Sequence, residues 1–281
     1  MNLHRDTAEI FVPDALPPDQ ALRRTTHLAV AAHQDDIEIM AAAPVLECYQ
    51  RRDRWFTGVV VTDGRGSPRN GMYGRYSDEE MRMVRLKEQR KAAIIGEYAA
   101  QIMLDYPSKE VKENSALPVE DLASILQATR PRHVYTHNLA DKHDTHVGVA
   151  LKVIAAIRSL PRDMRPQKLY ACEVWRGLDW LLDSDKVAFD LSAQENLQAA
   201  LLGVFDSQIS GGKRYDQASL ARRKANATYF ESHGLDLTTG LSFGLDMTAL
   251  ILDDGKEPVV FIQEFVQRFA QDVIDRLQRV S

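Results

Sequence analysis

The sequence predicts an α/β protein in which a mostly parallel sheet is covered by helices on both faces. Short runs of consecutive apolar residues, such as 59–61, are typical of strands that are buried on both sides. These runs alternate with longer segments of helical periodicity, and a strand–helix–strand order of this kind produces right-handed βαβ units. With 281 residues, 44% of them hydrophobic and 27% charged, the chain has the size and composition of a globular enzyme.

In the first part of the chain, buried strands and amphipathic helices follow one another closely after a polar lead-in that ends at Arg24. Ser77 and Glu80 form the reciprocal pattern of a capping box, which predicts that a helix begins there. The expected strands lie at 27–32, 56–62, 101–104 and 133–136, and the expected helices at 37–52, 77–95, 119–129 and 146–158.

Beyond residue 158 the alternation is less regular. The expected strands lie at 168–175 and 187–191, and the expected helices at 195–205, 215–232 and 258–278. The last helix carries one apolar stripe, from which we expect it to dock on the core. The chain contains no internal repeat and no low-complexity linker. We therefore expect a single domain over 1–281, a Rossmann-like three-layer α/β/α structure with its core at about 25–160 and a C-terminal elaboration at about 161–281.

Charge and composition exclude several classes of partner. The net charge is −5 and the two signs are interspersed, whereas nucleic-acid binding requires a clustered positive field. No apolar stretch approaches the ~20 residues of a membrane span, and the first 24 residues lack the apolar core of a signal peptide. Cys48 and Cys172 show no paired spacing, which favours reduced thiols and a cytoplasmic location. We therefore expect a small-molecule substrate, and the oligomeric state stays open, with a homo-oligomer as one alternative.

A first cluster of ionisable residues follows the strand at 27–32. His33, Asp35 and Asp36 stand where the strand ends, the edge at which parallel sheets bind ligands. An imidazole and a carboxylate three residues apart can converge on one metal ion, and such ligands suit Zn²⁺. The second carboxylate would then be free to act as a general base. The alternative is a helix N-cap, in which an aspartate satisfies backbone N–H groups.

A second cluster follows the strand at 133–136. Three of the eight histidines of the chain lie within 137–146, among them His143 and His146 at the start of a helix. Solvated loop residues would explain this segment taken alone. Because two such clusters at strand ends can meet across the sheet, a shared metal site explains both together.

These two segments resemble a known family. Residues 32–38, Ala-His-Gln-Asp-Asp-Ile-Glu, are similar to the A-H-P-D-D-x-E signature of the PIG-L/LmbE-like de-N-acetylases. Residues 137–146 resemble the second motif of that family, H-x-x-D-x-H-x-D-H, with a short difference in spacing before Asp141. The resemblance covers the order of elements from about residue 28 to 158, and the remainder of the chain matches no motif of the family.

The resemblance implies roles for particular residues. It implies that His33, Asp36 and His146 bind Zn²⁺ or another divalent metal and that Asp35 is the general base. It also implies that His143 stabilises the oxyanion or protonates the leaving amine.

Two positions depart from the family pattern. Gln34 replaces the usual proline, and Thr145 replaces the usual aspartate between the two histidines. Without that aspartate, His143 lacks a carboxylate that would favour its charged form.

Two arginines are candidates for substrate binding. Arg65 lies in a glycine-rich loop that is either a flexible connection or a rim of the active site. Arg85 lies with Glu88 on the inward stripe of the helix at 77–95, either as a structural ion pair or, as the family implies, as a residue that shapes the sugar site. We expect the basic run 222–224 to lie on a solvated helix face. Trp175 could stack on a sugar, but we expect it to pack in the core.

Together these observations predict hydrolysis of an N-acyl group, N-acetyl by the resemblance, on an amino-sugar conjugate. The alternatives are a nucleotide-sugar transferase and a non-catalytic sugar-binding module. A transferase needs a diphosphate cradle, and the first strand is followed by His33, Asp35 and Asp36 rather than by a glycine-rich turn.

Overall fold

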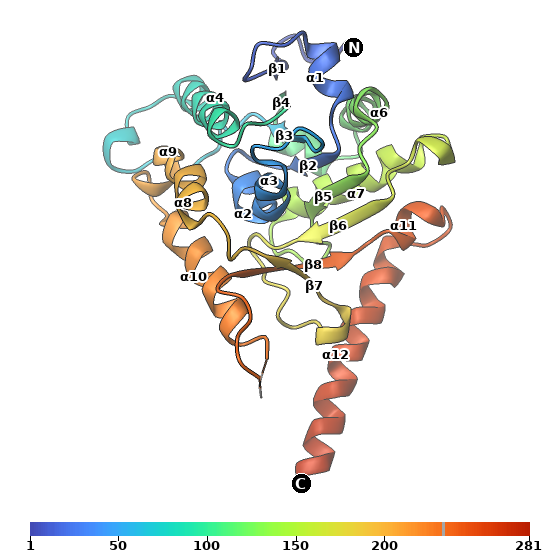
Figure 1. The fold of residues 1–281 in the computed structure, drawn as a ribbon. Helices are drawn as coiled ribbons and strands as arrows, with labels where there is room; N and C mark the ends of the chain where they lie inside the picture. Colours follow the sequence, from blue (N-terminus) through green and yellow to red (C-terminus); the bar gives the residue numbers. More distant parts are fainter. Residues whose placement is uncertain (232–233) are drawn as a thin grey trace.

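A computed structural model describes residues 1–231 and 234–281 of the protein. One sheet of eight strands, in the order β1-β4-β3-β2-β5-β6-β8-β7, runs through the molecule (Figure 1). The strands are β1 (Glu9–Phe11), β2 (His27–Ala31), β3 (Phe56–Thr62), β4 (Ala100–Tyr106), β5 (His133–His137), β6 (Lys168–Cys172), β7 (Val187–Asp190) and β8 (Leu241–Asp246).

The centre of the sheet is parallel and its edges are antiparallel. β4, β3, β2, β5 and β6 pair in parallel, whereas β1, β8 and β7 pair antiparallel to their neighbours. The predicted α/β class with a mostly parallel sheet is confirmed. Since the chain leaves β2 toward β3 on one side and later reaches β5 on the other, the strand order reverses at β2. A crevice at the carboxyl ends of β2 and β5 is the usual ligand site of such a sheet.

The helices form two layers. They are α1 (Pro18–Arg23), α2 (Asp36–Met40), α3 (Ala42–Cys48), α4 (Asp78–Ile95), α5 (Ser108–Lys112), α6 (Leu117–Thr129), α7 (Asp144–Arg158), α8 (Glu195–Gly203), α9 (Asp206–Ile209), α10 (Tyr215–Thr228), α11 (Ala249–Leu252) and α12 (Pro258–Val280). Residues of β2 alternate between the faces: Leu28 and Val30 pack with α6 and α7, and Ala29 and Ala31 pack with α2, α3, α4 and α8. Each face of the sheet therefore has its own apolar core.

The helix predicted at 37–52 is two helices. Ala41, with φ −114° and ψ 24°, interrupts the α-helical backbone between α2 and α3. Pro44 lies in the first turn of α3 and has no N–H to donate, and its ring would collide with the carbonyl of Met40 in a continuous helix. The interruption therefore follows from the proline, and the second helix ends at Cys48.

Other predicted boundaries differ by a few residues. The capping box of Ser77 and Glu80 is formed, with both reciprocal hydrogen bonds present. α8 and β6 end earlier than expected, at Gly203 and Cys172. α10 ends at Thr228, and Ser232, the predicted end of that helix, lies outside the described residues.

The expectation that the last helix docks on the core is confirmed for its first turns only. Phe261 of α12 is buried, but Val273 is 40% exposed and Leu277 is 60% exposed. Figure 1 shows α12, in red, extending away from the body of the molecule to the C-terminus. The helix has 23 residues, about 35 Å at 1.5 Å per residue, and extends beyond the surface on which its first turns pack. No helix among the described residues is long and apolar enough to cross a membrane.

Candidate active site at the carboxyl ends of β2 and β5

The two polar clusters of the sequence meet at one edge of the sheet. Residues 33–36 follow β2 and residues 138–146 follow β5, and these strands are parallel neighbours. Their carboxyl ends therefore point to the same side, where the two turns face each other.

Three donor atoms form a nearly equilateral triangle there. His33 Nδ1 lies 3.2 Å from Asp36 Oδ2, and His146 Nε2 lies 3.2 Å from His33 Nδ1 and 3.3 Å from Asp36 Oδ2. Ligands bound tetrahedrally at 2.0–2.1 Å from a metal ion lie about 3.3 Å apart. The residues therefore fit a divalent ion held by three protein ligands, the arrangement that leaves a fourth position open.

The tautomer of His146 is set by a carboxylate that we did not single out from the sequence. Asp141 Oδ2 lies 3.3 Å from Nδ1 of His146, and its Oδ1 accepts the backbone N–H of His143 at 3.1 Å. A proton on Nδ1 leaves the lone pair of Nε2 for a metal, as in other carboxylate–histidine–metal arrangements. The signal in the sequence was the position of Asp141 in the second motif, five residues before His146.

His137 belongs to an overlapping group with Asp141 and His146, but its geometry favours a different role. Its Nε2 accepts the backbone N–H of Ala32 at 2.8 Å, and its ring stacks on that of His146 at 3.9 Å between centroids. Burial, together with the nearby His146 ring, holds the pKa of His137 well below its usual range. The neutral His137 ring therefore holds the end of β2 through this hydrogen bond and packs against the His146 ring.

Asp35 has an unusual backbone conformation beside the triangle. Its φ is 85°, which is uncommon for a residue other than glycine and is typical of strained positions at functional sites. Its N–H donates to Gln89 Oε1 at 3.2 Å, and its Oδ1 lies 3.7 Å from Arg85 Nη2. Burial raises the pKa of Asp35 to about 7, although the Arg85 guanidinium opposes this shift. The carboxyl group is held at the wall of the cavity by this turn.

His143 and Thr145 also line the cavity. The His143 ring stacks on that of His146 at 4.6 Å and meets that of His33 edge-on at 5.1 Å between centroids. Burial, with the neighbouring His146 and His33, lowers the pKa of His143 to about 4. No described residue forms a hydrogen bond with its Nδ1.

A cavity of about 620 Å³ opens over the triangle. Residues of the two motifs lie on one side of it, and residues from several other elements complete it. The latter are Ile39, Gly64, Gly66, Ser67, Pro68, Arg85, Ser108, Lys112, Val174, Trp175, Gln208, Lys213, Tyr215, Ala218, Ser219 and Arg222.

Residues 28–157 match the model of the family PIG-L, described as GlcNAc-PI de-N-acetylase. The resemblance to the PIG-L family is confirmed. The matched segment runs from β2 almost to the end of α7 and contains both motifs. The lining residues from Val174 onward all lie outside it, so the PIG-L segment supplies the donor triangle and the rest of the chain completes the cavity.

Solved structures share the fold at low sequence identity. The chain is similar to the conserved protein TT1542 of Thermus thermophilus, with 20% identity and a TM-score of 0.59, covering 79% of this chain and 94% of that one. It is similar to the 4-carboxy-2-hydroxymuconate hydratase GalB of Pseudomonas putida, with 16% identity, a TM-score of 0.59 and coverages of 79% and 96%. It is also similar to the N,N'-diacetylchitobiose deacetylase of Pyrococcus horikoshii, with 16% identity, a TM-score of 0.60 and coverages of 78% and 83%. No curated protein sequence matches the chain.

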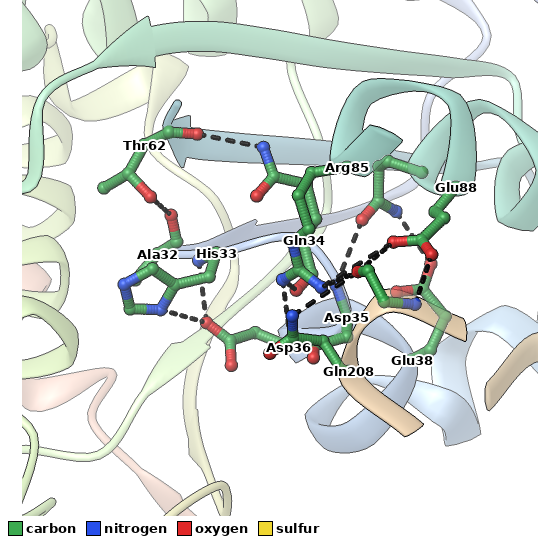
Figure 2. Close-up of polar contacts among 12 residues, drawn as sticks. Ala32, His33, Gln34, Asp35, Asp36, Glu38, Thr62, Arg85, Glu88 and Gln208 are labelled. Atoms are coloured by element: carbon green, nitrogen blue, oxygen red, sulfur yellow. Dashed lines mark hydrogen bonds and ion pairs between the residues drawn. The ribbon is translucent and has the colours of Figure 1, made fainter. Parts of the chain in front are cut away.

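Arg85 connects the PIG-L motif to α4. Its Nη2 donates to the carbonyl oxygen of Gln34, and its Nη1 lies 3.8 Å from Glu88 Oε2, as Figure 2 shows. Glu88 also accepts the N–H and the hydroxyl of Ser207, each at 2.7 Å. Arg85 is buried and holds the turn that carries Asp35, while lining the cavity. The structure thus shows the ion pair, and contact between Arg85 and substrate stays a prediction.

Arg65 lies beside the cavity without lining it. Its side chain is 43% exposed and forms ion pairs with Asp63 at 3.3 Å and Glu79 at 3.0 Å. The neighbouring residues Gly64 and Gly66 do line the cavity. The loop therefore contributes backbone to the wall, and substrate binding by the Arg65 side chain stays a prediction.

Proposed function

We propose that the protein is a zinc-dependent hydrolase that removes the N-acetyl group from an amino-sugar conjugate. The observation that carries this proposal is the donor triangle of His33, Asp36 and His146, two of which line the same cavity as Asp35. The match to the PIG-L family supports the same reaction class.

The residues divide the reaction between them. His33, Asp36 and His146 would hold the metal, which when bound supplies a Lewis acid for the amide carbonyl and makes water a stronger nucleophile. Asp35 takes a proton from the attacking water, and its orientation is fixed by Gln89 and Arg85.

On the same cavity wall, His143 can donate an N–H to the developing oxyanion or to the leaving amine. The backbone of its segment is held by Asp141. The products are acetate and a free amine on the sugar, since one water is added across the amide bond.

A nucleotide-sugar transferase and a sugar-binding module without catalytic activity are the alternatives. In the turn after β2, the side chain of Asp36 is directed to His33 and to the backbone N–H of that residue. A carboxylate there repels a diphosphate, which binds instead to glycine-rich backbone at this position in transferases and dehydrogenases. The site therefore favours hydrolysis.

The experiment combines metal analysis with a substrate panel. Purified protein is analysed for metals by mass spectrometry, and N-acetylated amino sugars and their glycosides are assayed for released amine and acetate. We expect about one zinc per chain, equal amounts of the two products, loss of activity on chelation, and recovery when zinc is added back. His146→Ala should lose most of the metal.

Other results would overturn the proposal. Sugar binding without metal or turnover would indicate a binding module, and consumption of a nucleotide sugar without released amine would indicate a transferase. Stoichiometric metal in the His146→Ala variant would remove His146 from the ligand set.

We also propose a cytoplasmic location, which the buried free thiols of Cys48 and Cys172 support. Cell fractionation with detection of the native protein tests it, and recovery from the medium or an extracytoplasmic fraction would contradict it.

A further inference from the structure

One wall of the cavity comes from the C-terminal part of the chain, outside the PIG-L segment. Trp175 follows β6, and Lys213, Tyr215 and Arg222 belong to α10 or the residues just before it. The Lys213 ammonium lies 4.1 Å from the centre of the Trp175 ring, and the Tyr215 ring meets that of Trp175 edge-on at 5.9 Å. Trp175 packs against the core as expected, but it is only half-buried and also lines the cavity.

The basic run at 222–224 is also not a solvated helix face. Arg223 is buried and donates to the carbonyl oxygens of Glu38 and Ile39, at 2.8 and 3.2 Å. Arg222 donates one Nη1–H to the carbonyl oxygen of Val174, beside Trp175, and lines the cavity. Only Lys224 of the run is exposed, where it pairs with Glu195. Two consecutive arginines of α10, Arg222 and Arg223, thus point inward.

The charges on the cavity wall are unbalanced. The lining residues include two carboxylates, Asp35 and Asp36, and both face the donor triangle or Arg85. Three further lining residues, Lys112, Lys213 and Arg222, take part in none of the ion pairs formed by the described residues. A bound divalent ion would add positive charge at the floor, so it would leave these cations uncompensated.

Acidic residues close to this wall in the sequence make other contacts. Glu173 accepts the backbone N–H groups of Leu178 and Phe243, at 2.7 and 2.8 Å, and the Asn226 amide at 3.0 Å. Asp216 pairs with Arg214 at 2.7 Å. Asp206 accepts the hydroxyl groups of Tyr73 and Ser210, each at 2.6 Å. None of them forms an ion pair with Lys213 or Arg222, although the Arg222 charge opposes the burial that raises the pKa of Glu173.

We infer that Lys213 and Arg222 bind an anionic group, a carboxylate or a phosphate, that the substrate carries on the side of the sugar away from the acetamide. The Trp175 ring beside Lys213 adds an apolar surface to this wall, against which a sugar ring can pack. Cations that converge on a cavity without a carboxylate partner favour a charged ligand group, since each gains a charge-assisted hydrogen bond. This inference rests on the proposed function for the identity of the reacting end.

The test compares substrates that differ in charge. The zinc-loaded enzyme is assayed with the methyl glycoside of N-acetylglucosamine, with N-acetylglucosamine 1-phosphate, and with the glycoside of a hydroxy acid that supplies a carboxylate. Binding of the same compounds is measured by calorimetry in phosphate-free buffer. We expect at least one anionic compound to bind about 10-fold more tightly than the neutral glycoside, and the better of the two identifies the anion.

Variants then locate the anion. Lys213→Gln and Arg222→Gln should each weaken binding of the anionic compound and raise its KM by about 10-fold, with little change for the neutral glycoside. Arg222→Lys should retain most of the preference. Lys87→Gln is the matched control, since Lys87 is an exposed lysine of α4 that does not line the cavity.

The outcomes separate this inference from the proposed function. Turnover without a preference for the anionic compounds, or variants that weaken charged and neutral compounds equally, would overturn the anion site alone. Selective binding of an anionic compound without turnover of any glycoside would support the anion site and overturn the hydrolase.

Discussion

Replacing Asp141 by asparagine tests the geometry of the metal site without touching a ligand. The Asp141 carboxylate accepts from His146 Nδ1 at 3.3 Å, from the backbone N–H of His143 at 3.1 Å and from the backbone N–H of Trp175 at 3.2 Å. Asparagine has the same shape but only one acceptor oxygen, so at least one of these donors must face an NH₂ group. The carboxylate that fixes the tautomer of His146 is also lost.

The magnitude follows from this loss of an orienting partner. Substitution of such partners typically reduces metal affinity by about 10–100-fold, which corresponds to about 1.4–2.7 kcal/mol of binding free energy. We expect Asp141→Asn to bind zinc that much more weakly, with a thermal midpoint near that of wild type when zinc is in excess.

The assay is competition for zinc against a chromophoric chelator, with dissociation constants for wild type, Asp141→Asn and Asp144→Asn. Asp144 is an exposed aspartate in the same segment, and its substitution should leave the affinity within about 2-fold, as expected for surface changes. Equal affinities for wild type and Asp141→Asn would refute the argument that Asp141 orients His146.

Further predictions concern other parts of the chain. Asp35→Asn should keep its metal and lose about 10²–10⁴ in kcat, whereas Asp36→Asn should lose the metal; reversed phenotypes in metal analysis and kinetics would mean that ligand and base are exchanged. Arg85→Ala should raise KM more than it lowers kcat if the guanidinium contacts substrate, while a lower melting temperature with intact kinetics would leave only the ion pair. Burial, with the positive charge of neighbouring groups, lowers the pKa of His27 from 6.5 to about 4, so the folded state disfavours the proton that the unfolded chain binds. The free energy of unfolding should therefore fall as the pH drops below 6.5, and His27→Gln should remove up to about 2 kcal/mol of that fall between pH 6.5 and 5. Urea titrations in which wild type and His27→Gln lose the same free energy of unfolding over this pH range would contradict this. Deleting residues 271–281 should change the unfolding free energy by less than about 1 kcal/mol, because their apolar side chains are largely exposed; a large loss would show that a partner covers this end of α12.

Local sequence determined the elements and the chemistry at their ends. Consecutive apolar residues at 59–61 are typical of a strand that is buried on both faces, and the capping box at Ser77 marks a helix start by hydrogen bonds that span three residues. His33 and Asp36 share one turn, so their convergence is also a local property. The break between α2 and α3 was also predictable from Pro44, because the clash of its ring involves a carbonyl only one turn earlier in the sequence.

The order of the strands decided the rest. His137 and His146 both offered an imidazole, and only the pairing of β5 with β2, which places the Ala32 N–H on His137, separated the supporting ring from the ligand. In the same way Arg65 stands in the loop expected at the site but turns to Asp63, while Lys213 and Arg222 reach the cavity from a helix that no motif marks. Periodicity shows that a helix has an apolar face but not what covers it, as α12 demonstrates. Spacing along the chain fixes which side chains share a turn, whereas contacts between distant segments depend on sheet order and packing, which the complete fold alone provides.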